Sequence, residues 1–176
     1  MAIETRLLPK LGVLNQMITS FNPPITRYQC LANGFISGSI SIEDRSILTH
    51  DKIVIPMAIR EDRFSKVQQR INILSEYIIG VYPRTVDGKL LFEVSNIFLP
   101  NEVDPDLIDR FRLRGEITYF DGDRGRLKII TRTNASYSVE FFSDGEYYEL
   151  DLQEFWELNC TRIGKELIIT GPNYLI

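Results

Sequence analysis

The chain has 176 residues, carries a formal net charge of -4, and is 44% hydrophobic and 25% charged. This composition is typical of a folded globular protein with room for one or two small domains, and it excludes a long disordered chain. No uninterrupted apolar run approaches the roughly 20 residues that a membrane-spanning helix needs. The acidic balance also disfavours a protein that coats duplex DNA.

Histidine and cysteine are scarce, with one His50 and two cysteines, Cys30 and Cys160. This scarcity excludes a Cys-only zinc centre and any mechanism that needs paired histidines, so we predict neither a metal nor a cofactor. The start Met1-Ala-Ile-Glu4 lacks the basic residues of a signal peptide, and the cysteines are expected to be free thiols. We therefore expect a cytoplasmic protein.

The first 24 residues are expected to form a helical arm. Apolar residues recur there at alternating spacings of four and three, which is typical of a helical stripe, and Pro23 and Pro24 would end the helix. The arm either packs on the body of the protein or docks on a partner or a second copy of the chain. Its partner-binding residues would be Leu11, Leu14 and Ile18.

From residue 25 onward the pattern becomes that of β-strands. Residues 28–42 are apolar but are interrupted by Gly34 and Gly38, which predicts a strand with a bulge or a barrel corner. Residues 52–59 form a second apolar run. Between residues 61 and 77 the apolar positions recur every three or four residues, which predicts an α-helix.

An Asp-Gly pair marks the first hairpin. Asp87-Gly88 lies between two strand-like runs and favours a two-residue type I′ turn, because both turn residues must adopt positive φ. This turn places Val81 opposite Val94 and Tyr82 opposite Glu93.

A second hairpin is expected from residues 112–120 and 126–133, which flank a glycine-containing turn. If Phe120 lies opposite Arg126, the odd-numbered positions face the core and the even-numbered positions face outward. The predicted buried residues are Leu113, Ile117, Tyr119, Leu127 and Ile129.

A third hairpin is expected to join residues 137–141 to residues 148–152 through a turn at Asp144-Gly145. Its register would place Phe142 opposite Tyr147 on the outer face. It would also add Val139 and Leu150 to the core.

Together these elements predict an all-β protein with one or two short helices. The glycine-broken strands, the hairpins and the inserted helix favour two small β-barrels in tandem, of the oligonucleotide/oligosaccharide-binding (OB) kind. A single β-sandwich or SH3-like barrels are the alternatives. We expect a helical arm over residues 1–24, a first barrel over 25–103 and a second over 104–176, with the polar, proline-containing residues 100–106 at the boundary.

No catalytic motif is recognisable in the sequence. It has no Gly-x-Ser-x-Gly elbow, Walker-type loop or Gly-x-Gly-x-x-Gly turn, so we do not expect an enzyme. His50 lies in a polar loop without an evident chemical partner. The acidic Asp121-Gly-Asp123 sequence is best explained as a hairpin turn rather than as a cation site.

Two surfaces are candidates for binding. Cations that share one face of the second hairpin would repel each other unless something negative covers them, and a neighbouring aromatic ring could stack on a base. Single-stranded nucleic acid is therefore the expected ligand. The residues of this strip are Arg112, Arg114, Arg126, Lys128 and Arg132, with Phe120 as the stacking ring. The alternative is a protein-interaction or assembly module, including a homo-oligomer, that uses the helical arm and an acidic-rimmed patch of Phe142 and Tyr147.

Overall fold

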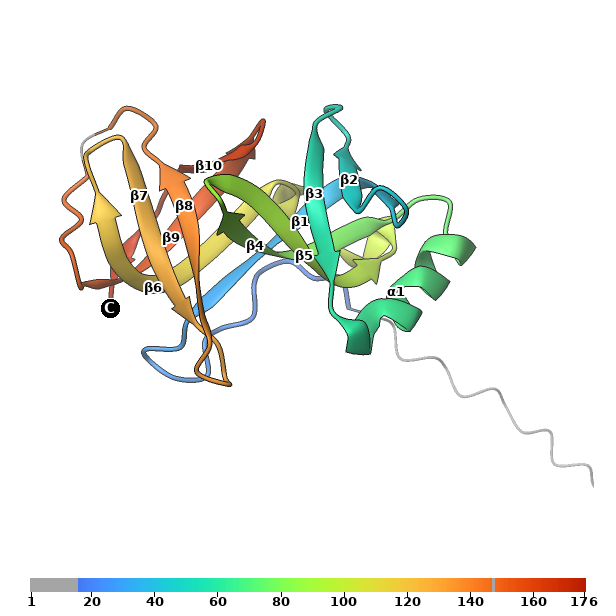
Figure 1. The fold of residues 1–176 in the computed structure, drawn as a ribbon, viewed down its shortest axis with the longest axis horizontal. Helices are drawn as coiled ribbons and strands as arrows, with labels where there is room; N and C mark the ends of the chain where they lie inside the picture. The colour runs from blue at the N-terminus through green and yellow to red at the C-terminus, as the bar shows by residue number, and fades with distance from the viewer. Residues whose placement is uncertain (1–15, 147) are drawn as a thin grey trace, which may run out of the picture.

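The structure is a computed structural model that describes residues 16–146 and 148–176. It is an all-β body with one α-helix, as expected from the sequence (Figure 1). The elements of the first half are β1 (Leu31–Ser41), β2 (Ser46–Thr49), β3 (Val54–Ile59), α1 (Glu61–Ile73), β4 (Ile78–Val86) and β5 (Lys89–Phe98). The strands of the second half are β6 (Arg110–Phe120), β7 (Arg124–Ile130), β8 (Ser136–Phe142), β9 (Phe155–Ile163), β10 (Glu166–Ile169) and β11 (Tyr174–Leu175), and two 3-10 turns, Pro100–Glu102 and Pro105–Leu107, join the halves.

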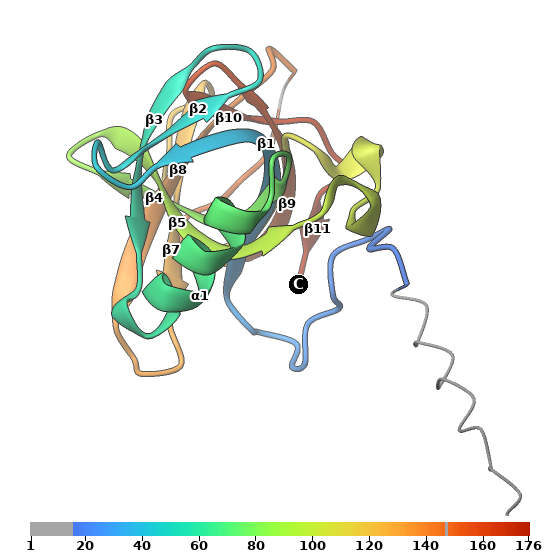
Figure 2. The same cartoon turned by 90° about the vertical axis from the view of Figure 1, so that its right-hand side faces the viewer.

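The first five strands close into a barrel. β1 pairs with β2, β2 with β3, β3 with β5, β5 with β4 and β4 with β1, so the circuit of hydrogen bonds returns to its start. Only the β3–β5 pairing is parallel. The helix α1 connects β3 to β4 and lies across one end of the barrel, where it buries Val67 (Figure 2). The predicted OB-like barrel with an inserted helix is confirmed.

The second half repeats this circuit. β6 pairs with β7, β7 with β8, β8 with β10, β10 with β9 and β9 with β6, and again only the third and fifth strands of the set run parallel. The parallel seam is narrow, because Ile168 opposite Phe142 is its one register pair. The two barrels lie side by side (Figure 1), which is the tandem arrangement expected from the sequence rather than a single sandwich.

The Asp87-Gly88 hairpin has the predicted geometry. Asp87 and Gly88 have φ angles of 50° and 73°, as a type I′ turn requires. The register places Val81 opposite Val94 and pairs the neighbouring residues as expected. The turn chemistry and the alternation of apolar residues were therefore sufficient to define this hairpin.

The barrels are joined through their first strands. β1 pairs with β6 over four residues, from Leu31 opposite Arg114 to Gly34 opposite Phe111. The Phe111 ring lies directly against Gly34, where a Cβ atom would be only 2.2 Å from it, and it stacks on Phe92 of the first barrel at 5.6 Å. One continuous apolar cluster thus spans both barrels.

The predicted register of the β6–β7 hairpin is wrong by one position near its turn. Tyr119, and not Phe120, lies opposite Arg126, and the register shifts between Ile117 and Tyr119. This bulge reverses which face the last residues of β6 occupy. Tyr119 is consequently 37% exposed instead of buried, and Phe120 turns inward to stack on Phe141 at 6.2 Å. The other predicted core residues are buried: Leu113, Ile117, Leu127, Ile129, Val139 and Leu150.

The predicted third hairpin does not form. β8 pairs with β7 and β10, and residues 143–146 and 148–154 contain no strand. β8 thus pairs with β7 and β10 in place of the local partner that the Asp144-Gly145 turn suggested. Tyr147 lies outside the described residues, so its predicted position opposite Phe142 has no structural counterpart.

The N-terminal arm is not helical where the structure describes it. Residues 16–21 form no helix, and Ile18 instead makes a parallel bridge to Val103, with backbone hydrogen bonds on both sides. Phe21 packs beside it and stacks on Phe35 at 5.7 Å. Leu11 and Leu14 lie outside the described residues.

Candidate nucleic-acid interface

Arg114 does not lie on an open basic surface, contrary to the sequence-based assignment. Its side chain is 3% exposed and forms an ion pair with Glu157, its cross-strand neighbour on β9. It also donates hydrogen bonds to the backbone carbonyls of Arg27, at 2.6 Å, and Gln29, at 3.2 Å. Arg114 therefore fixes the segment that leads into β1, which is a structural role.

Arg112 is likewise buried, at 6% exposure. It donates a hydrogen bond to the Asn22 carbonyl and lies over the Phe21 ring at 5.4 Å, while its Nε atom has no partner. Burial lowers the pKa of this guanidinium, and the nearby Glu157 carboxylate offsets only part of that effect. Both predicted strip residues on β6 thus belong to the junction between the barrels.

The exposed part of the predicted strip lies on β7. Arg126 and Lys128 project from the outer face of this strand, as the alternation predicted, and Arg124 joins them. Arg126 forms an ion pair with Glu140 of β8 at 2.8 Å, whereas Arg124 and Lys128 form no ion pair with any described residue. Arg132 is exposed in the turn that follows β7. Residues 124, 126 and 128 alternate along the strand and therefore share its outer face. This alternation could have added Arg124 to the predicted basic strip, but the sequence suggested a turn at residue 124.

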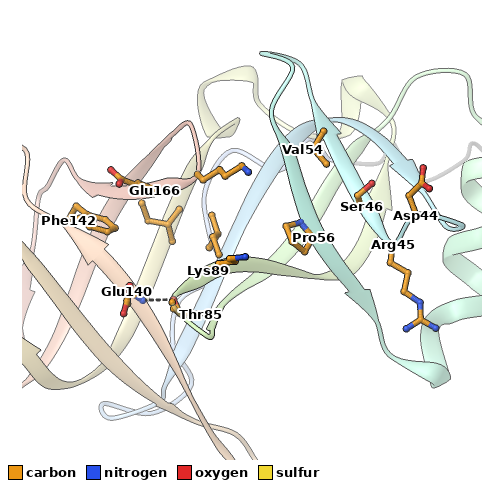
Figure 3. Close-up of a pocket in the computed structure, with 14 residues that line it drawn as sticks. Asp44, Arg45, Ser46, Val54, Pro56, Thr85, Lys89, Glu140, Phe142 and Glu166 are labelled. Atoms are coloured by element: carbon orange, nitrogen blue, oxygen red, sulfur yellow. Dashed lines mark hydrogen bonds between the residues drawn. The ribbon is translucent and has the colours of Figure 1, made fainter.

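A cleft of about 590 Å³ opens between the barrels (Figure 3). OB barrels bind their ligands on the face of the second and third strands and on the loops that follow the first and fourth strands. In the first barrel these are β2, β3, the β1–β2 loop and the β4–β5 turn, and all four line the cleft through residues such as Arg45, Ser46, Val54 and Lys89. The cleft therefore lies where OB barrels usually bind their ligands.

The opposite wall comes from the second barrel. Glu140 and Phe142 of β8 lie across from Val54 and Pro56 of β3, as Figure 3 shows. Lys165, in the turn between β9 and β10, completes this wall. β8 and this turn correspond to β3 and the β4–β5 turn of the first barrel, so equivalent parts of both barrels face the same space.

The basic side chains that line the cleft lack ion-pair partners among the described residues, whereas two of its acidic side chains have partners. Arg45 and Lys165 come from two loops and Lys89 begins β5, and none of the three forms an ion pair with another described residue. Of the acidic side chains, Glu140 is held by Arg126, and Asp44 accepts a hydrogen bond from the Ser41 hydroxyl at 2.9 Å. Glu166 is the third carboxylate of the lining. Figure 3 shows the Arg45 side chain directed away from Phe142, so Lys89 and Lys165 are the cations that the cleft offers beside its apolar residues.

Direct contacts hold the two walls in place. The Glu140 backbone N–H donates to the Thr85 hydroxyl of β4 at 2.8 Å, which ties the β4–β5 hairpin to the edge of β8 (Figure 3). Nearby, the Arg84 guanidinium lies over the Tyr137 ring of β8 at 4.5 Å. Burial raises the pKa of Tyr137 to about 12, so this phenol stays neutral beside the cation.

A buried arginine makes a second connection. The Arg162 side chain of β9 is fully buried and donates to Asp51, in the β2–β3 loop, at 2.7 Å and to Asp109 at 2.8 Å. Burial alone disfavours its charge, but these two carboxylates outweigh that effect and raise the pKa of Arg162. The Arg162 and Thr49 hydrogen bonds hold the pKa of Asp51 well below its usual range.

The polar groups that the sequence offered as candidates for chemistry have structural partners. His50 is half exposed and lies 3.6 Å from Asp109, whose carboxylate already binds Arg162. Asp121 accepts hydrogen bonds from the backbone N–H groups of Asp123 and Arg124, which, with the Tyr119 hydroxyl, lower the pKa of Asp121 to about 2 and account for the turn. Among residues 16–146 and 148–176 no cluster of three potential metal ligands occurs, and no helix has the length and apolarity to cross a bilayer.

The comparisons with known proteins leave the site to be interpreted from its own geometry. Searches against protein-family models and against curated proteins found no match to this chain.

Proposed function

We propose that this protein is a non-enzymatic module that binds single-stranded nucleic acid. The bound nucleic acid would run over the outer face of β7 and β8 and enter the cleft between the barrels. The observation that carries this proposal is that one cleft is lined by parts of both barrels at which OB barrels usually bind ligands, and that Lys89 and Lys165 in its lining form no ion pair with a described residue. Phe142 joins the cleft to the β7–β8 face, because it pairs with Arg124 across the two strands.

The net charge of -4 is compatible with this proposal. Electrostatic interactions at physiological salt are screened over about 8 Å, so the charges near the contact decide whether phosphates are attracted. On β7, Arg124 and Lys128 have no carboxylate ion pair among the described residues. The acidic remainder of the protein is expected to slow encounter and to limit affinity without preventing binding.

Removing the β7 cations is expected to flatten the salt dependence of binding. For a single strand, log K falls with log salt by about 0.7 for each phosphate neutralised, so Lys128→Gln should flatten the slope by roughly that amount. The double variant Arg124→Gln/Lys128→Gln should flatten it by roughly 1–2 units. Fluorescence anisotropy with a labelled oligothymidylate across a salt series measures both slopes.

A matched control is Lys66→Gln, which removes one exposed cation from α1, outside the cleft and the β7–β8 face. This variant should leave the slope unchanged. Equal slopes for the wild-type protein, Lys128→Gln and Lys66→Gln would contradict the placement of the ligand on β7.

The alternative of a protein-interaction or assembly module rests on fewer residues than the sequence suggested. Ile18 is engaged with Val103 of its own chain, and Phe142 lines the cleft. If no nucleic acid binds, a protein partner seated in the cleft becomes the leading proposal. A cytoplasmic location is proposed with either function, because Cys30 and Cys160 are free thiols.

A further inference from the structure

We infer that the cleft holds one unpaired nucleobase of the bound strand, sandwiched between Phe142 of the second barrel and the apolar wall of β3 in the first. This inference rests on the proposed function and deepens it, because it names the chemical unit that the cleft recognises. It also requires both barrels to contribute to one subsite.

The walls of the cleft have the chemistry of a stacking site. Phe142 is half-buried, and its ring stacks on no other aromatic ring within the described residues. Across the cleft, Val54 is 52% exposed and Pro56 is also exposed, although both belong to a barrel strand. Single-stranded bases commonly stack on aromatic and apolar side chains in this way.

The rim of the cleft has the chemistry of a phosphate contact. Lys89 lies between the β3 wall and Glu140 in Figure 3, and Lys165, in the turn between β9 and β10, belongs to the lining on the side of the second barrel. A nucleotide has the complementary form, with a flat base between charged phosphates. The cleft volume of about 590 Å³ is that of a site for a discrete ligand, within the usual range of about 300–1,000 Å³.

This geometry selects against duplexes. A base inside a double helix is stacked on both neighbours and cannot enter a cleft unless it is first extruded at an energetic cost. The hydrogen bond between Glu140 and Thr85 ties the two walls together, so a base that enters the cleft would have to be splayed out of its stack. The subsite therefore predicts a preference for single strands that phosphate contacts on β7 alone would not give.

Abasic nucleic acid separates base recognition from phosphate recognition. The two probes are a fluorescein-labelled oligothymidylate of about 12 nucleotides, within the site sizes of OB folds, and an abasic strand of equal length. The wild-type protein should bind the oligothymidylate about 5- to 150-fold more tightly, which is the contribution of stacking one base. Phe142→Leu should lose most of this preference while it binds the abasic strand as tightly as the wild type does.

Tyr174→Leu is the matched control, because it removes an exposed aromatic ring from β11, outside the cleft. It should keep the full preference for bases. Equal wild-type affinity for the two strands, or an equal loss on both in Phe142→Leu, would overturn the base subsite while the proposed function stands. Failure of the wild-type protein to bind either strand at low salt would instead refute the proposed function itself.

Discussion

Replacing Arg114 by methionine is expected to lower the free energy of unfolding by about 3–5 kcal/mol, because it breaks a buried ion pair by removing one partner. The substitution would leave the largely buried Glu157 carboxylate without its cation and would remove the donors to two backbone carbonyls. Methionine is long enough to replace much of the arginine stem, so the loss would report the polar contacts more than a cavity.

Urea unfolding of Arg114→Met measures this loss. The control Arg124→Met makes the same chemical change on the exposed face of β7 and should cost less than about 0.5 kcal/mol. Adding Glu157→Gln to Arg114→Met should cost less than the two single changes summed, since the uncompensated charge is then removed. Similar losses for Arg114→Met and Arg124→Met would contradict the burial of Arg114.

Replacing Leu127 by alanine is expected to cost about 2–5 kcal/mol, as is usual when a large core side chain leaves a cavity. Leu127 has no exposed surface and lies opposite Val139 within the second barrel. Its neighbour Lys128 points outward on the same strand, so Lys128→Ala should cost less than about 0.5 kcal/mol. Urea titrations of the two variants compare the two faces of β7 directly.

Equal losses for Leu127→Ala and Lys128→Ala would mean that β7 does not present one apolar and one basic face. This result would also remove the basis for placing a ligand on the strand, because Arg124 and Lys128 owe their exposure to the same alternation.

Local patterns in the sequence were sufficient to predict several elements of the fold. The Asp87-Gly88 turn has few conformational options, and the runs on either side of it alternate, so the register of β4 and β5 could be predicted from the turn back to Val81. The register shift between Gly80 and Val81 was not predicted. The helical spacing of residues 61–77 similarly predicted α1. Two hairpin-rich halves of similar length then favoured the tandem barrels that the structure confirms.

Long-range pairing explains the errors. β6 lies between strands of both barrels, because β1 pairs with Arg112 and Arg114 along one edge of β6 and β9 pairs with the same two residues along the other edge. β7 pairs only with the later part of β6, from Glu116 to Phe120. No periodicity in the sequence indicates this crossing, so the two arginines were assigned to an open surface. The bulge beside Tyr119 could not be predicted either, since it depends on how two strands fit and not on one residue type.

The candidate site also depends on long-range packing that the sequence pattern does not reveal. The alternation in β7 correctly predicted that Arg126 and Lys128 are exposed. The cleft, however, is formed by segments more than 100 residues apart, such as Arg45 and Lys165, and it exists only because the barrels pack side by side. Phe142 was singled out as an exposed aromatic, but the wall that faces it became evident only from the structure.

The most direct test of single-strand binding is an anisotropy titration of the unmodified protein against two labelled probes of the same sequence, one single-stranded and one duplex, between about 50 and 200 mM salt. We predict that the single strand binds more tightly and that its log K falls linearly with log salt by about 0.7 for each phosphate neutralised. No binding of the single strand at the lowest salt, or binding that does not change with salt, would contradict the proposal.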